Sequence, residues 1–101
     1  MVGDATPGGW NNPVPTPAQQ FTETSLGVFE LTVSLTANKS FLFLPVNGDW
    51  GHKVGGLVAT NNTNNVNGDL LRAEGSDLKA PATDGSYKIT VNLINMSYKV
   101  E

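Results

Sequence analysis

The most regular hydrophobic pattern in this chain of 101 residues is Gly27-Val28-Phe29-Glu30-Leu31-Thr32-Val33-Ser34-Leu35-Thr36. Apolar and polar side chains alternate, and because successive side chains of a strand point to opposite faces, the pattern predicts a half-buried strand over residues 27–36. Thr36-Ala37-Asn38-Lys39 then predicts a turn, and the apolar run Phe41-Leu42-Phe43-Leu44 predicts a second strand over residues 40–46. Because the connection is short, we expect the two strands to form a hairpin.

A second hairpin is predicted at the end of the chain. Apolar side chains at alternate positions of residues 87–93 face one way: Tyr87, Ile89, Val91 and Leu93. Residues 94–96 connect them tightly to residues 97–101, which return with Tyr98 and Val100 facing inward. The core expected from both hairpins consists of Phe29, Leu31, Val33, Phe41, Phe43, Tyr87, Ile89, Val91 and Tyr98.

The remaining segments predict loops and short strands. Proline and glycine interrupt residues 4–20, and glycine and asparagine recur in residues 46–56 and 60–69, so all three segments predict loops. A short strand is predicted at residues 57–59, and residues 70–73 fit either a short strand or one helical turn. Since no window combines a 3.6-residue period with helix caps, the chain as a whole predicts an all-β sandwich or barrel.

Length, charge and composition narrow the class of protein further. A chain of this length supports one domain, residues 1–101, with a single modest core. The net charge of -3 and the pI near 4.9 argue against a nucleic-acid partner, which usually requires a basic patch. No stretch approaches 18 apolar residues, no signal peptide is recognisable, and no cysteine is present. The opening Met1-Val2-Gly3-Asp4 is typical of a domain excised from a longer protein.

Catalytic motifs are scarce. The sequence contains no G-x-S-x-G elbow, no P-loop and no H-E-x-x-H motif. His52 is the only histidine, and although Asp49 lies three residues before it, this spacing in a glycine-rich loop defines no catalytic geometry. His52 is then either an exposed loop imidazole or a ligand contact. We expect neither enzyme activity nor a cofactor.

One segment partly fits a calcium-binding loop. Residues 63–74 place Asn65, Asn67, Gly68 and Glu74 at the positions of the pattern D-x-[DN]-x-[DN]-G-x5-E, but Thr63 replaces the first Asp. Calcium requires negative charge from its ligands, and this loop offers only Glu74 and Asp69. We therefore expect a polar hairpin loop and no metal site.

The two tryptophans are the strongest functional signal. Trp10 and Trp50 both lie in predicted loops and are flanked by glycine and asparagine. An indole ring offers a large flat apolar area with little rotamer freedom to lose, which suits stacking on the C–H face of a sugar ring. The chain also offers hydrogen-bond donors that suit sugar hydroxyls: Asn11, Asn12, Lys53 and Arg72. The alternative is that one or both rings plug the end of a sandwich.

Several segments in order resemble the domains of the SusE and SusF starch-binding lipoproteins. The resemblance rests on Val2-Gly3-Asp4-Ala5-Thr6-Pro7-Gly8-Gly9-Trp10, Gly27-Val28-Phe29-Glu30-Leu31-Thr32, Phe41-Leu42-Phe43-Leu44, Gly48-Asp49-Trp50-Gly51 and Asp84-Gly85-Ser86-Tyr87-Lys88-Ile89-Thr90-Val91. It implies an immunoglobulin-like antiparallel β-sandwich that acts as a carbohydrate-binding module without catalysis. It also implies sister domains in the same chain and a lipid anchor, outside these residues, that holds the protein on the outer face of the outer membrane.

The resemblance also implies how sugar is held. In such domains an aromatic pair curves to fit an α-glucan chain, and Lys or Arg donates to its hydroxyls. Here Trp10 and Trp50 would form the pair, with Lys53 and Arg72 as donors, and Asn11 and His52 complete the candidate ligand-binding residues. The alternative function is a structural spacer or protein-interaction domain that binds no sugar. Exposure of the two indole rings favours binding, and their burial favours the spacer.

Overall fold

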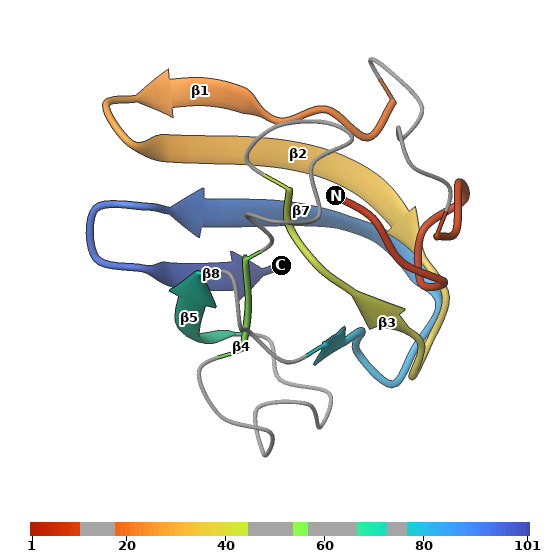
Figure 1. The fold of residues 1–101 in the computed structure, drawn as a ribbon. Coiled ribbons are helices and arrows are strands. Elements are labelled where there is room, and N and C mark those ends of the chain that lie inside the picture. The colour runs from red at the N-terminus through yellow and green to blue at the C-terminus, as the bar shows by residue number, and fades with distance from the viewer. Residues whose placement is uncertain (11–17, 45–53, 57–66, 73–76) are drawn as a thin grey trace.

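The computed structural model describes residues 1–10, 18–44, 54–56, 67–72 and 77–101 (Figure 1). Every regular element in these residues is a strand and every pairing between strands is antiparallel, which confirms the all-β prediction. The strands are β1 (Thr22–Ser25), β2 (Val28–Leu35), β3 (Ser40–Phe41), β4 (Val54–Gly56), β5 (Asn67–Arg72), β6 (Leu78–Lys79), β7 (Gly85–Asn92) and β8 (Ser97–Val100). No helix in the described ranges is long and apolar enough to span a bilayer.

Two sheets make up the fold. The larger one has six strands in the order β1-β2-β7-β8-β5-β4, and the smaller one pairs β3 with β6. The longest ladder joins β2 to β7, from Val28 opposite Asn92 to Leu35 opposite Gly85. Two isolated bridges extend the smaller sheet, one from Leu42 to Val2 and one from Phe43 to Val54 of β4. In Figure 1 the chain that contains β3 passes in front of β2 and β7.

The predicted hairpin of residues 27–36 and 40–46 is wrong. β2 pairs with β1 and β7, whereas β3 pairs with β6. The connection between β2 and β3 is held by other segments, since the N–H of Thr36 donates to the Ala5 carbonyl at 2.8 Å and that of Ala37 to Asp84 Oδ1 at 2.6 Å. The chain therefore crosses from one sheet to the other.

Burial on two faces explains this crossing. Phe41 and Phe43 are buried in the main core, whereas Leu42 is buried on the opposite face against Val2, with Leu44 beside them. Phe41-Leu42-Phe43-Leu44 thus has apolar contacts on both sides. A hairpin partner on a sheet with a solvated face would leave one of these two sides in water.

The terminal hairpin is confirmed. β7 pairs with β8 from Ile89 opposite Val100 to Asn92 opposite Ser97, with the connection at residues 93–96. Asn92 Oδ1 accepts from the N–H groups of Ile94 and Asn95, and Met96 adopts a positive φ of 54°. These features produce a tight connection.

β5 was predicted only in part. Residues 67–69 were expected in a loop but belong to β5, where they pair with β8. Residues 70–72 of β5 pair with β4. Because strand pairing uses backbone N–H and C=O groups, residues 67–69 can join the sheet without apolar side chains. The strand predicted at residues 57–59 lies outside the described residues.

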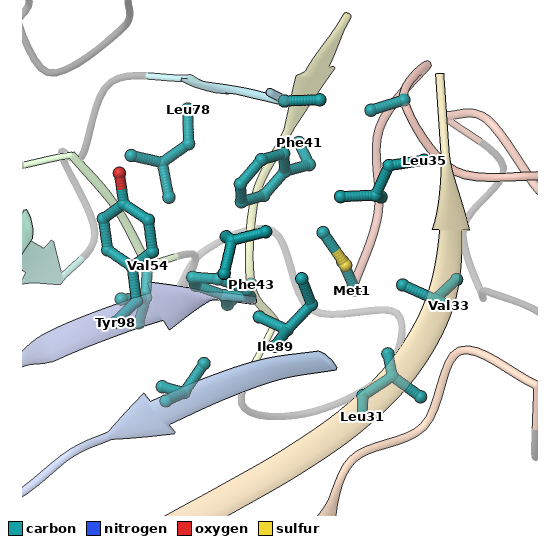
Figure 2. Packing of buried hydrophobic residues seen from close by; sticks show 14 residues of the cluster. Met1, Leu31, Val33, Leu35, Phe41, Phe43, Val54, Leu78, Ile89 and Tyr98 are labelled. Atoms are coloured by element: carbon teal, nitrogen blue, oxygen red, sulfur yellow. The ribbon is translucent and has the colours of Figure 1, made fainter. Parts of the chain in front are cut away.

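The core lies between the two sheets. Phe41, Leu78 and Phe43 of the smaller sheet and its extension face Leu31, Val33 and Ile89 of the larger one (Figure 2). The rings of Phe41 and Phe43 lie 5.6 Å apart between centroids, and the Tyr98 ring lies 6.5 Å from Phe41 and 6.2 Å from Phe43. Seven of the nine predicted core residues are buried, and Tyr87 is half-buried at the edge of the core. The prediction for Phe29 is wrong, since this residue is half-buried outside the core cluster.

Candidate functional site

Trp10 ends the first described segment and is exposed. Its fractional exposure is 41%, compared with 3% for Met1 and 0% for Val2 at the start of the same segment. The segment therefore anchors at one end in the core and carries its indole at the other. Two further large apolar side chains of the described residues are exposed, Leu26 at 86% and Ile94 at 70%.

Residues 3–9 form a closed loop immediately before Trp10. The N–H of Gly3 donates to the Gly9 carbonyl at 2.9 Å, which joins the two ends of the loop. Inside it, the N–H of Thr6 donates to the Gly3 carbonyl at 3.0 Å and that of Gly9 to the Thr6 carbonyl at 3.1 Å. Gly9 has a φ of 59°, in the left-handed region that glycine adopts without a steric penalty. The chain thus enters Trp10 from a defined turn.

The loop is fastened to the start of the smaller sheet. The Asp4 carboxylate accepts from the N–H of Ser40 at 2.7 Å, and the N–H of Ala5 donates to the Ser40 carbonyl at 2.9 Å. Val2 exchanges two backbone hydrogen bonds with Leu42, at 3.0 and 2.8 Å. Val2 thus forms a bridge beside the β3 region, whereas residues 4–10 form turns and a bend, as their glycine and proline content predicted.

A buried glutamine supports the loop from the other side. Gln19 is 1% exposed and lies just before β1. Its Oε1 accepts from the N–H of Gly8 at 2.8 Å, and its Nε2 donates to the Met1 carbonyl at 2.9 Å and the Thr6 hydroxyl at 3.1 Å. The Thr6 hydroxyl in turn donates to the Gly3 carbonyl at 2.7 Å. Sequence reasoning missed Gln19, because nothing in its neighbours distinguishes it from the other polar residues of a loop.

The other predicted ligand-binding residues are described in part or not at all. Asn11, Trp50, His52 and Lys53 lie outside the described residues. Arg72 is the last residue of β5, where its backbone is opposite Val54 of β4, the residue that follows Lys53 in sequence. Trp10 is therefore the member of the predicted set whose side chain the structure places.

Electrostatics offer little for catalysis or metal binding in the described part of the chain. No group of three or more His, Cys, Asp or Glu side chains gathers there. Lys88 and Lys99 both pair with the Glu101 carboxylate, at 3.9 and 3.5 Å, on an exposed face. Burial raises the pKa of Tyr98 to about 12. Its hydroxyl has no hydrogen-bond partner among the residues described.

The segment that resembled a calcium loop is only partly described. Residues 67–69 lie in the antiparallel ladder between β5 and β8, with Gly68 opposite Tyr98. In a calcium loop of that pattern, the glycine at this position forms a sharp turn. The ladder therefore differs from the backbone that the alignment would require.

Comparison with known proteins adds one finding. The whole chain, residues 1–101, matches the family model described as "SusF, first starch specific CBM", that is, a carbohydrate-binding module. Searches of curated proteins and of solved structures find no significant match.

Proposed function

Because this chain belongs to the family of the first starch-specific carbohydrate-binding module of SusF, we propose that it binds starch-like α-glucan by aromatic stacking and has no catalytic activity. The observation that carries the proposal is the 41% exposure of Trp10 at the end of a hydrogen-bonded loop. A partly exposed indole on a defined loop offers a large flat apolar surface on which a sugar ring could stack.

The binding mode follows from the chemistry of both partners. The flat face of an indole matches the C–H face of a glucose ring, and desolvation of both surfaces stabilises the stack. Trp50 is proposed as the second ring, and Lys53, Arg72, Asn11 and His52 as donors or acceptors for sugar hydroxyls. An exposed donor exchanges a hydrogen bond with water for one with sugar, so the rings should dominate affinity and the polar residues should orient the chain.

The proposed architecture is an immunoglobulin-like sandwich. Two antiparallel sheets that enclose one core support it. A second support is the Tyr87 hydroxyl, which donates to the Thr83 carbonyl at 2.6 Å, four residues upstream and close to the start of β7. A tyrosine hydroxyl bonded back to the backbone at a strand corner is a hallmark of such sandwiches.

The family also supports a proposal about location. The domain would act on the outer surface of the outer membrane, beside sister domains of the same protein and tethered through a lipid anchor outside these residues. Such an arrangement increases retention of a long polysaccharide, because several weak sites on one molecule act together through a high effective concentration.

Affinity electrophoresis tests the proposal. We expect retardation of the parent domain in gels that contain amylopectin or pullulan, and unchanged mobility in gels with xylan or β-glucan. Trp10→Ala should lose most of the retardation, whereas the matched control Leu26→Ala should keep it. Leu26 is an exposed apolar residue just before the start of β2. The loop before Trp10 contacts Thr36, just after the end of β2, so the control changes a side chain at the opposite end of this strand. A parent domain that runs alike in all gels would instead favour a spacer.

A further inference from the structure

Gln19 is a buried polar residue that the proposed stacking does not explain. Its side-chain amide uses both N–H donors and its carbonyl oxygen, and all three hydrogen bonds go to residues 1–8. A glutamine that only filled space in a core would leave these polar groups without partners, at a cost in stability. The three bonds therefore point to a specific role in the N-terminal segment.

We infer that Gln19 is a positioning residue for Trp10. This inference rests on the proposed role of Trp10 in α-glucan binding. Gly8, which donates to Gln19 Oε1, lies two residues before the indole. Thr6, which accepts from Gln19 Nε2, also donates to the Gly3 carbonyl and accepts the backbone bond from Gly9. The amide thus connects to both halves of the loop that ends at Trp10.

The loop requires such a support because of its composition. Two consecutive glycines, Gly8 and Gly9, precede the indole, and glycine has more backbone freedom in the absence of constraints than any other residue. A ring on a mobile loop must be ordered when sugar binds, which lowers affinity, whereas a ring held beforehand avoids that loss. Gln19 orders the backbone at Gly8 before the sugar arrives.

The primary test compares Gln19→Met with the parent. Methionine has a similar length but cannot form the three hydrogen bonds. In the parent domain with both tryptophans, we expect the affinity for maltoheptaose to fall by roughly three- to tenfold. In a Trp50→Phe background without sugar, where Trp10 is the only indole, we expect lower fluorescence anisotropy and stronger acrylamide quenching.

Two controls separate positioning from general destabilisation. Ile89→Val lowers stability through the core without removing any of the loop hydrogen bonds, and should leave both the anisotropy and the affinity unchanged. Thr6→Val removes the hydroxyl between Gln19 and Gly3, whereas Thr6→Ser keeps it. If Gln19→Met does not fold, the two Thr6 variants decide. The sugar affinity and the anisotropy of Trp10 should fall in Thr6→Val and stay near parent values in Thr6→Ser.

The outcomes are distinct for the two proposals. If Gln19→Met and Thr6→Val fold and leave both the anisotropy of Trp10 and the sugar affinity at parent values, the positioning role is overturned. If Trp10→Ala binds maltoheptaose as the parent does, the proposed function fails at Trp10, and the sugar-free anisotropy still decides whether Gln19 orders the ring.

Discussion

Gly3 lies so close to Ser40 that a Cβ atom on Gly3 would overlap the Ser40 carbonyl oxygen. Gly3 also has a φ of 136°, outside the regions that residues with a side chain commonly adopt. This contact brings the N-terminal segment against the smaller sheet, where Asp4 and Ala5 form their own bonds to Ser40. The position of the loop that carries Trp10 therefore depends on a residue without a side chain.

Alanine substitutions at Gly3 and Gly9 should lower the free energy of unfolding by clearly different amounts. Gly3→Ala should lower the free energy of unfolding by about 3 kcal/mol or more, since it adds strain in φ to a clash with backbone atoms. Gly9→Ala should cost about 1–2 kcal/mol, because its φ of 59° is left-handed but nothing lies within 4 Å of the added Cβ. Urea denaturation of both variants measures the difference. Equal costs would show that the contact with Ser40 is not close.

Phe43 should be among the most important core residues. Its ring contacts those of Phe21, Phe41 and Tyr98, and it is 5% exposed. Phe43→Ala should therefore lower the free energy of unfolding by about 3–5 kcal/mol. The matched control is Phe29→Ala, which removes the same side chain from a half-buried position outside the core cluster and should cost clearly less. Chemical denaturation that ranks Phe29 above Phe43 would contradict this description of the core.

The hydroxyl of Tyr98 should contribute nothing to stability at neutral pH. It is buried without a partner among the described residues, so Tyr98→Phe should be neutral or stabilise the fold by about 1 kcal/mol. The measurement is the urea midpoint at pH 7. A loss above about 1 kcal/mol would reveal a hydrogen bond to this hydroxyl.

The same residue should produce an alkaline loss of stability. Its pKa rises from 10.0 in the unfolded chain to about 12 in the fold, so the fold retains the proton while the unfolded chain releases it. Stability is unaffected well below pH 10 and declines between pH 10 and 12, by roughly 2 kcal/mol in total. Denaturation at pH 9 and pH 11.5 measures this decline. It should be reduced in Tyr98→Phe, and an equal decline in both proteins would assign it to other groups.

Removal of divalent metals should leave the domain unchanged. The described residues contain no cluster of metal-ligating side chains, and residues 63–74 supply little negative charge for calcium. The midpoint of thermal unfolding should be the same with EDTA and with added calcium. A fall in EDTA that calcium reverses would restore the calcium loop as a site.

The sequence predicted the elements whose burial is decided locally. Alternation in residues 27–36 and 87–93 identified β2 and β7, and the tight connection predicted at residues 94–96 identified the terminal hairpin. It did not predict the partner of β3, because that partner is β6, which is distant in sequence. The bridges from Leu42 to Val2 and from Phe43 to Val54 also join segments that are far apart in the chain. The start of β5 was missed for a related reason, since pairing through the backbone needs no apolar pattern.

The candidate site was predicted to a lesser extent. Glycines around Trp10 predicted a loop, and the ring is exposed there. Gln19 could not be recognised, because its role arises from three contacts that only the folded chain brings together. Trp50, Lys53, Asn11 and His52 lie outside the described residues, so their place beside Trp10 remains a prediction.

Titration of the domain with maltoheptaose, followed by tryptophan fluorescence, tests the central claim most directly. We predict a saturable change in emission for the parent and for Leu26→Ala. Trp10→Ala and Trp50→Ala should each weaken binding by roughly tenfold or more, if a sugar ring stacks on indole with about the 1–3 kcal/mol per ring found for nucleic-acid bases. No change in the emission of the parent at millimolar sugar, together with loss of thermal stability in the tryptophan variants, would contradict the claim and identify the domain as a spacer.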